Sequence, residues 1–198
     1  MDLLKTNKAW TIWVTQKEKI LSQASKWKEA GVSTYACMFD LERRYQRSFI
    51  KITDEILNNH NLFPENYNFL ALDLENSDVS CLDIEGNPGS VEGFLEIMEE
   101  KSIDLSDFIV ERTFNNGLHI YFSSSKYKRK DNIFAMELKT IKLDVLYRGK
   151  VFTFPSCVGE KRYVPLFNME GNIKRDKIIE MPASILELFS KKPINIIY

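Results

Sequence analysis

The sequence predicts a mixed α+β (α/β) fold, in which a helix-rich N-terminal part precedes a part built mainly from short strands. One observation is the helical spacing of apolar residues over about residues 11–31. The other is a series of short runs from Phe69 onward, in which apolar and polar side chains alternate between turn-forming segments. We expect a single domain with two parts, about residues 1–66 and about residues 67–198.

The expected elements can be placed in order along the chain. They are a helix at about 11–31, a strand at 33–39, a helix from Thr53 to about Asn59, strands at 69–74 and 79–84, a helix after residues 86–90, strands at 108–113 and 118–122, strands at 141–146 and 150–154, and a closing helix at 178–190 interrupted near Pro182. Turn residues 115–117 and 147–149 each predict a hairpin. From Val79 the order strand, helix, strand, strand is how an RRM-like or ferredoxin-like half begins, with helices on one sheet face and the other face open.

Length and composition are those of a globular protein of ordinary size. The 198 residues are 44% hydrophobic and 28% charged, which suits one large or two small domains with a normal core. The formal net charge of −1 does not indicate a nucleic-acid binder, so any basic surface has to be local. No apolar run approaches the roughly 18 residues of a membrane span. We therefore expect a cytoplasmic protein, or a nuclear one in a eukaryotic host.

Cysteine usage argues against two kinds of small-domain framework. The three cysteines, Cys37, Cys81 and Cys157, lie far apart and form no C-x-x-C pair. Neither a disulfide framework nor a zinc module is expected from this spacing. We expect free buried thiols.

Acidic residues and a histidine occupy the polar positions of three strand-like runs. Because successive side chains of a strand point to opposite faces, Asp83, Glu85, His119 and Asp144 lie opposite the apolar faces of their strands. Asp83 and Glu85 are roughly 6–7 Å apart along one strand, a spacing at which two carboxylates can share divalent cations. Taken singly, each run also fits a half-exposed antiparallel strand, and a strand histidine is commonly a hydrogen-bonded structural residue.

Three motifs in order carry a resemblance to a known family. They are Leu82-Asp83-Ile84-Glu85-Gly86, then Thr113-Phe114-Asn115-Asn116-Gly117-Leu118-His119-Ile120-Tyr121-Phe122, then Leu143-Asp144-Val145 with Phe154-Pro155-Ser156 downstream. This succession, over about residues 68–156, resembles the Prim-Pol branch of the archaeo-eukaryotic primase superfamily, the primase–polymerases of plasmids, phages and viruses. The resemblance implies a two-part primase core with an RRM-like catalytic half and DNA-directed nucleotidyl transfer on a single-stranded DNA template.

The resemblance also implies roles for individual residues. Asp83, Glu85 and Asp144 would be the catalytic ligands of Mg²⁺ or Mn²⁺, ions that prefer the oxygen donors these side chains offer. His119 would contact the triphosphate of the incoming nucleotide. Further contacts to the nucleotide are expected from Asn116, Gly117, Arg148 and Ser156. The implied partners are a single-stranded DNA template and primer and nucleoside triphosphates. A replicative helicase is a further partner that the resemblance allows.

A basic segment and two rival functions complete the predictions. Lys126, Lys128, Arg129 and Lys130 would contact a nucleic-acid backbone, or form an ordinary solvated loop. A metal-dependent nuclease would also need paired acids, and Glu137-Leu138-Lys139 supplies the E-x-K triplet of restriction-type nucleases. A non-catalytic RRM-like module would stack bases on sheet aromatics, for which Tyr121 is the one aromatic on the expected open face of the three motif strands.

Overall fold

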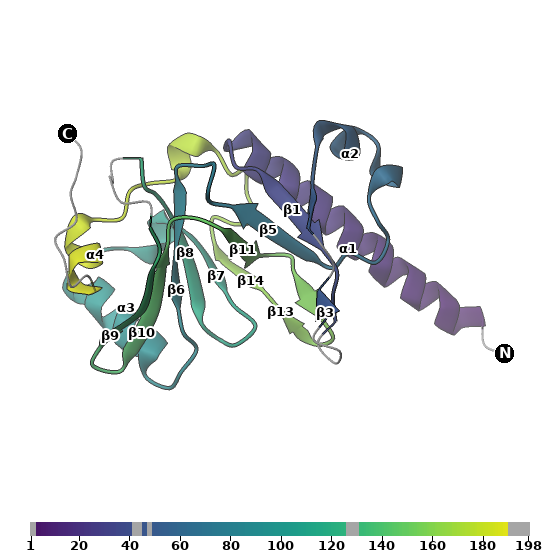
Figure 1. Cartoon of the computed structure of the whole chain (residues 1–198). Coiled ribbons are helices and arrows are strands. Elements are labelled where there is room, and N and C mark those ends of the chain that lie inside the picture. Colours follow the sequence, from purple (N-terminus) through teal and green to yellow (C-terminus); the bar gives the residue numbers. More distant parts are fainter. Residues whose placement is uncertain (1–2, 41–44, 47–48, 126–130, 190–198) are drawn as a thin grey trace.

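The chain folds into antiparallel sheets and a few helices, as the predicted α+β class requires (Figure 1). The computed structural model describes residues 3–40, 45–46, 49–125 and 131–189. Its helices are α1 (Leu3–Glu29), α2 (Asp54–Asn58), α3 (Ser90–Glu100) and α4 (Ala183–Phe189), with short 3₁₀ turns at His60–Leu62, Leu105–Asp107 and Arg175–Lys177. Among these helices none is long and apolar enough to cross a membrane.

The strands form two main sheets, which lie side by side in Figure 1. They are β1 (Thr34–Cys37), β2 (Phe39–Asp40), β3 (Tyr45–Gln46), β4 (Ile50–Lys51), β5 (Phe69–Asp73), β6 (Val79–Ile84), β7 (Ile109–Arg112), β8 (Leu118–Ser123), β9 (Ile133–Leu138), β10 (Ile141–Leu146), β11 (Lys150–Thr153), β12 (Cys157–Val158), β13 (Lys161–Arg162) and β14 (Val164–Phe167). The smaller main sheet has the order β11-β5-β1-β4, and the larger has the order β14-β7-β8-β6-β10-β9. Each hydrogen-bonded strand pair in both sheets is antiparallel.

Helix α1 packs on the four-stranded sheet and ends at the glycine that the sequence places there. Gly31 has a φ of +82°, a conformation that glycine adopts without steric cost. Its N–H donates to the carbonyl oxygen of Lys28, and the N–H of Val32 donates to that of Trp27, which closes the last turn. The helix begins at Leu3 instead of about residue 11, because residues 3–10 contain no Gly or Pro to stop it.

The six-stranded sheet buries its two faces differently. Helices α3 and α4 cover one face, where Phe94 and Ile185 pack with strand residues such as Leu82, Ile84 and Ile120. The sequence therefore predicted the helix-covered face correctly. The opposite face is not open along its whole length. Its second core includes the following residues: Trp27, Cys81, Ile109, Tyr121, Met169 and Ile173.

The predicted hairpin of residues 141–146 and 150–154 is wrong. Strand β10 lies in the six-stranded sheet and pairs with β6, whereas β11 lies in the four-stranded sheet and pairs with β5. The β5–β6 segment and the β10–β11 segment run antiparallel to each other through both sheets. Between the sheets the N–H of Leu74 donates to the carbonyl oxygen of Gly149. The segment 147–149 therefore carries the chain from the six-stranded sheet to the four-stranded sheet and does not form a hairpin turn.

Two further elements differ from expectation. Strand β9 was not predicted, and it forms the edge of the six-stranded sheet beside β10. The closing helix begins at Ala183, directly after Pro182, and Glu180 instead forms a bridge with Ser123 of β8. Proline stops a helix from extending back through it, because it lacks the N–H and crowds the preceding residue.

Candidate active site

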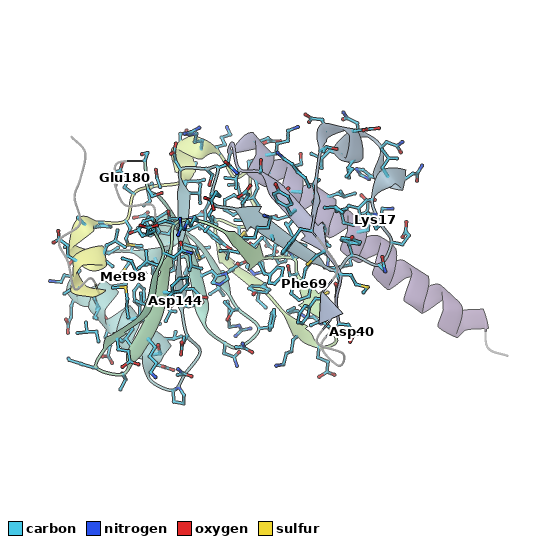
Figure 2. All side chains as sticks on the ribbon, viewed as in Figure 1. Lys17, Asp40, Phe69, Met98, Asp144 and Glu180 are labelled. Atoms are coloured by element: carbon cyan, nitrogen blue, oxygen red, sulfur yellow. The ribbon has the colours of Figure 1, made fainter. Side chains whose placement is uncertain are left out.

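Four ionisable side chains form one row across the six-stranded sheet. Asp144 of β10 pairs with Asp83 of β6, Asp83 pairs with His119 of β8, and His119 pairs with Glu111 of β7. Residues that are directly opposite in an antiparallel pair carry their side chains on the same face, about 4.5–5.5 Å apart at Cβ. The predicted shared face of Asp83, Asp144 and His119 is thus confirmed, and Glu111 extends the row. Figure 2 places Asp144 between Met98 on the α3 side and Phe69 in the four-stranded sheet.

Two glycines bring the loops at the end of this row into close contact. A Cβ atom on Gly86 would lie 1.8 Å from the carbonyl oxygen of Asn115, and a Cβ on Gly117 would lie 2.2 Å from that of Ile84. Neither position tolerates a side chain, because the opposing atoms are backbone. The loop after the acidic strand and the turn before the histidine strand therefore pack backbone to backbone, which fixes the register of Asp83 against His119.

His119 is buried between two carboxylates. Its Nδ1 atom lies 3.0 Å from Oε1 of Glu111, and its Nε2 atom lies 3.4 Å from Oδ1 of Asp83. The side chain of His119 is 5% exposed, and that of Asp83 is 38% exposed, so the row passes from the interior to the surface. Burial lowers the pKa of His119, but the hydrogen bonds to Asp83 and Glu111 and their negative charge outweigh it and raise the pKa to about 9. At neutral pH the ring is an imidazolium with two N–H donors.

Glu111 is the site residue that the motifs did not identify. Its side chain is fully buried, and each of its two oxygens accepts two hydrogen bonds. Oε1 accepts from His119 Nδ1 at 3.0 Å and from the Tyr121 hydroxyl at 2.7 Å. Oε2 accepts from the Thr153 hydroxyl at 3.1 Å and from the backbone N–H of Phe154 at 2.7 Å. The register of the 115–117 hairpin was the available signal, because it sets Glu111 opposite His119.

Aromatic rings line the inner side of the row. The ring of Tyr163 lies 5.6 Å from that of His119, centroid to centroid, and Tyr121 packs edge-on against Trp27 at 5.2 Å. Burial, followed by the charges of Glu111 and Asp83, raises the pKa of Tyr163, so this phenol stays neutral. The inner end of the row is buried, and its outer end at Asp83 and Asp144 is partly exposed to solvent.

Glu85 lies one step beyond the row. Its backbone N–H extends the ladder to the carbonyl oxygen of Lys142, so it shares the face of Asp83, as predicted. Its carboxylate accepts a hydrogen bond of 2.6 Å from the side-chain amide of Asn87. Beside it, Lys142 forms an ion pair of 3.1 Å with Glu137 of β9. The structure therefore brings Asp83 and Asp144 together directly, and it places Glu85 in a neighbouring row with Lys142.

Asp83 and Asp144 offer oxygen donors of the kind that a divalent metal ion prefers. Within the residues that the structure describes, no group of three or more His, Cys, Asp or Glu side chains could hold a metal ion. Mg²⁺ is commonly held by only one or two carboxylates, with waters and substrate phosphates completing its octahedron. The Asp83–Asp144 pair fits a site of that kind, which substrate would complete.

The other predicted nucleotide contacts lie at different depths. Asn116 is exposed in the β7–β8 turn with a φ of +62°, next to Gly117. Arg148 is exposed and forms an ion pair of 3.3 Å with Asp131. Ser156 is buried, and its hydroxyl is hydrogen-bonded to both the backbone N–H and the carbonyl oxygen of Leu70. Lys126, Lys128, Arg129 and Lys130 lie outside the described residues.

A β-bulge adds an exposed aromatic ring beside Asp144. The register between β9 and β10 shifts at this point, so that Asp144 faces two residues of β9, Phe134 and Ala135. Ile133 packs against the α3–α4 core, so the next residue, Phe134, points to the face of Asp144. Phe134 is 62% exposed. Exposed aromatic rings on a sheet are surfaces on which nucleic-acid bases stack.

Two cavities of the structure lie away from the row. They have volumes of about 310 and 370 Å³, and Gly31 and Val32, just after the C-terminal end of α1, line both of them. No residue of the acidic row lines either of them. The outer end of the row lies on the sheet surface, where Asp83 and Asp144 are partly exposed. Comparisons of the chain with models of known protein families and with curated proteins give no match.

Proposed function

We propose that the chain catalyses DNA-directed nucleotidyl transfer, as a primase or DNA polymerase that uses Mg²⁺ or Mn²⁺ on a single-stranded template. The observation that supports this most is the pairing of Asp83 with Asp144 across β6 and β10, with His119 directly opposite Asp83. Two carboxylates on a solvent-facing sheet surface, next to a buried cation, form a site for a metal–triphosphate complex.

Each residue has a part in this chemistry. A metal ion at Asp83 and Asp144 would neutralise charge on the α-phosphate and activate the attacking 3′-hydroxyl. The imidazolium of His119 donates its Nε2–H to a triphosphate oxygen, a charge-assisted hydrogen bond that is stronger than a neutral one. The closed aromatic side of the row at Tyr163 and Tyr121 keeps water away from His119. Gly117, two residues before His119, fits only as glycine, because its N–H donates to the Thr113 hydroxyl and a Cβ atom would lie 2.2 Å from the carbonyl oxygen of Ile84.

The three motifs support the finer assignment. The order of the Asp83–Glu85 strand, the His119 strand and the Asp144 strand resembles that of the Prim-Pol branch of the archaeo-eukaryotic primases. Under this proposal the six-stranded sheet with α3 and α4 is the RRM-like catalytic half. Helix α1 and the four-stranded sheet then form the other half of a two-part primase core, and this half includes β5 and β11 from beyond the expected boundary at about residue 66.

Two observations weigh against the rival functions. In the E-x-K triplet Glu137 is already paired with Lys142, and Lys139 lies in the β9–β10 turn with a φ of +58°. The stacking aromatic of a binding module, Tyr121, is fully buried and bonded to Glu111, so the expectation that it lies on an open face is wrong. Neither rival accounts for a buried histidine between two carboxylates.

The test is incorporation of radiolabelled nucleotides on single-stranded DNA, with and without a primer, and with Mg²⁺ or Mn²⁺. We expect template-dependent products that disappear when EDTA is added. The same reactions, run with end-labelled DNA, report cleavage. Metal-dependent shortening of the DNA without any incorporation would reject the polymerase and favour the nuclease, and tight DNA binding without either reaction would favour the binding module.

A further inference from the structure

A buried polar contact with four hydrogen-bond donors lies behind the candidate site, at a residue that the three motifs do not include. Glu111 is a carboxylate with no exposed surface, and four donors from two segments of the chain converge on it. A buried charge is costly unless its lone pairs are satisfied. Here each oxygen has two donors, so the carboxylate is fully satisfied as an anion.

The four donors divide between the two main sheets. Oε1 of Glu111 holds His119 and Tyr121 of β8, in the six-stranded sheet. Oε2 holds the Thr153 hydroxyl at the end of β11, in the four-stranded sheet, and the N–H of Phe154 just beyond it. Glu111 therefore ties the histidine strand to the other half of the fold through a single side chain.

The contact also fixes which way the imidazole ring faces. An ionised carboxylate only accepts hydrogen bonds, so Nδ1 of His119 has to carry the proton that Oε1 of Glu111 receives. With Nδ1 held from behind, Nε2 is left on the side of Asp83, 3.4 Å from its Oδ1 atom. Glu111, at the buried end of the row, therefore determines that Nε2 is the nitrogen of His119 that faces the exposed end of the row.

We propose that Glu111 is a positioning residue, which holds the imidazole of His119 so that its Nε2 atom faces the nucleotide phosphates beside Asp83. This inference rests on the proposed function for the identity of the phosphates, while the orientation of the ring can be tested without any activity. A histidine nitrogen is commonly oriented by a carboxylate on its other nitrogen, and loss of such a partner costs about 10–100-fold in metal sites.

Nuclear magnetic resonance of the wild-type chain tests the orientation directly. The sequence has only two histidines, His60 and His119, so ¹⁵N-labelled histidine gives two rings, and His60→Gln assigns them. We expect Nδ1 of His119 to carry a proton that exchanges slowly with water. Addition of a nucleotide with Mg²⁺ should shift the Nε2 signal and leave the Nδ1 signal in place. An Nδ1 signal of an unprotonated ring nitrogen would overturn the proposal, whatever the enzyme does.

A double-mutant cycle tests whether the orientation matters for nucleotide binding. Glu111→Gln places an amide group where one acceptor oxygen stood, so one pair of donors loses its acceptor. We expect Glu111→Gln to weaken nucleotide binding about tenfold by calorimetry with Mn²⁺, and His119→Ala to weaken it at least as much. Because Glu111 acts through His119, the double variant should bind no more weakly than His119→Ala.

The controls separate the two proposals. The matched variant Glu137→Gln removes an exposed carboxylate of the same sheet and should leave nucleotide affinity unchanged. An equal loss from Glu111→Gln in both backgrounds would mean that Glu111 is only structural. If the wild-type chain binds no nucleotide, the proposed function fails, and the Nδ1 signal still decides the orientation of His119. If Glu111→Gln does not fold, that signal in the wild-type chain decides as well.

Discussion

The two faces of the six-stranded sheet carry different kinds of side chain although they belong to the same strands. Leu82 and Ile84 of β6 point into the core under α3 and α4 and have no exposed surface. Asp83, between them, points to the other face and is 38% exposed. Because successive side chains of a strand point to opposite faces, core residues and candidate site residues alternate one by one along β6. Substitutions of neighbouring residues should therefore affect different measurements.

The largest effect is expected on the charged face, from Asp83→Asn or Asp144→Asn. Each change removes a carboxylate from the proposed metal site, where several kcal/mol of transition-state stabilisation is at stake, so nucleotide incorporation should fall by about 10³-fold or more. The unfolding temperature should change little for Asp144→Asn, whose side chain is partly exposed, and should fall modestly for Asp83→Asn, which removes a carboxylate that hydrogen-bonds the buried His119. The measurement is the incorporation rate together with thermal unfolding. The matched control Asp107→Asn, at an exposed position away from the row, should keep full activity.

The next effect is expected one residue away, on the apolar face. Leu82→Ala leaves a cavity among fully buried neighbours and should lower the free energy of unfolding by about 2–5 kcal/mol. Urea denaturation measures this value, and the activity of the fraction that remains folded should stay close to wild type. A Leu82→Ala chain that is as stable as the wild type, or one that is stable but inactive, would contradict the separation of the two faces.

The sequence predicted the alternation of faces and the central part of the row, because both follow from residues that are local in the chain. Strand parity placed Asp83, His119 and Asp144 on one face, and the structure confirms it. Glu111 was not predicted, because its partners Thr153 and Phe154 come from a strand more than forty residues away. The meaning of that position depends on how the two sheets meet, which local patterns do not encode.

The errors have the same origin. Residues 147–149 look like a hairpin turn, but whether β10 and β11 pair depends on which partner each finds, and β6 and β5 are those partners. Tyr121 has the right parity for an exposed aromatic, yet α1 covers it through Trp27. Both mistakes concern how α1 and the four-stranded sheet meet the six-stranded sheet. Periodicity predicts which side chains share a face, and it does not predict what covers that face.

A smaller effect is expected from the acidic residue beyond the row. Glu85→Gln keeps the side chain's shape and its exposed position, where it bonds Asn87 and lies near Lys142. Because the Asp83–Asp144 pair suffices for a site that substrate completes, incorporation should fall by less than about threefold. The measurement is the rate at limiting Mg²⁺, compared with that of Asp83→Asn. A loss as large as that of Asp83→Asn would mean that Glu85 turns inward and becomes a third ligand when metal binds.

The smallest effect is expected on the alkylation rates of the buried thiols, Cys37 in the four-stranded sheet and Cys81 in the six-stranded sheet. Burial raises the pKa of Cys37 to about 12, and burial together with the charges of Asp83 and Glu111 raises the pKa of Cys81 well above its ordinary value. A thiol whose pKa is raised on folding stays protonated, so its stabilising contribution is present below about pH 9 and is lost as the pH rises toward 12. At pH 8 both thiols should react with iodoacetamide much more slowly than the half-buried Cys157. Mass spectrometry of timed reactions, with urea-unfolded chain as the control, measures the three rates. Rapid labelling of Cys81 in the folded chain would show that α1 leaves the inner face of the six-stranded sheet accessible, and the row from Glu111 to Asp144 would then be open at both ends.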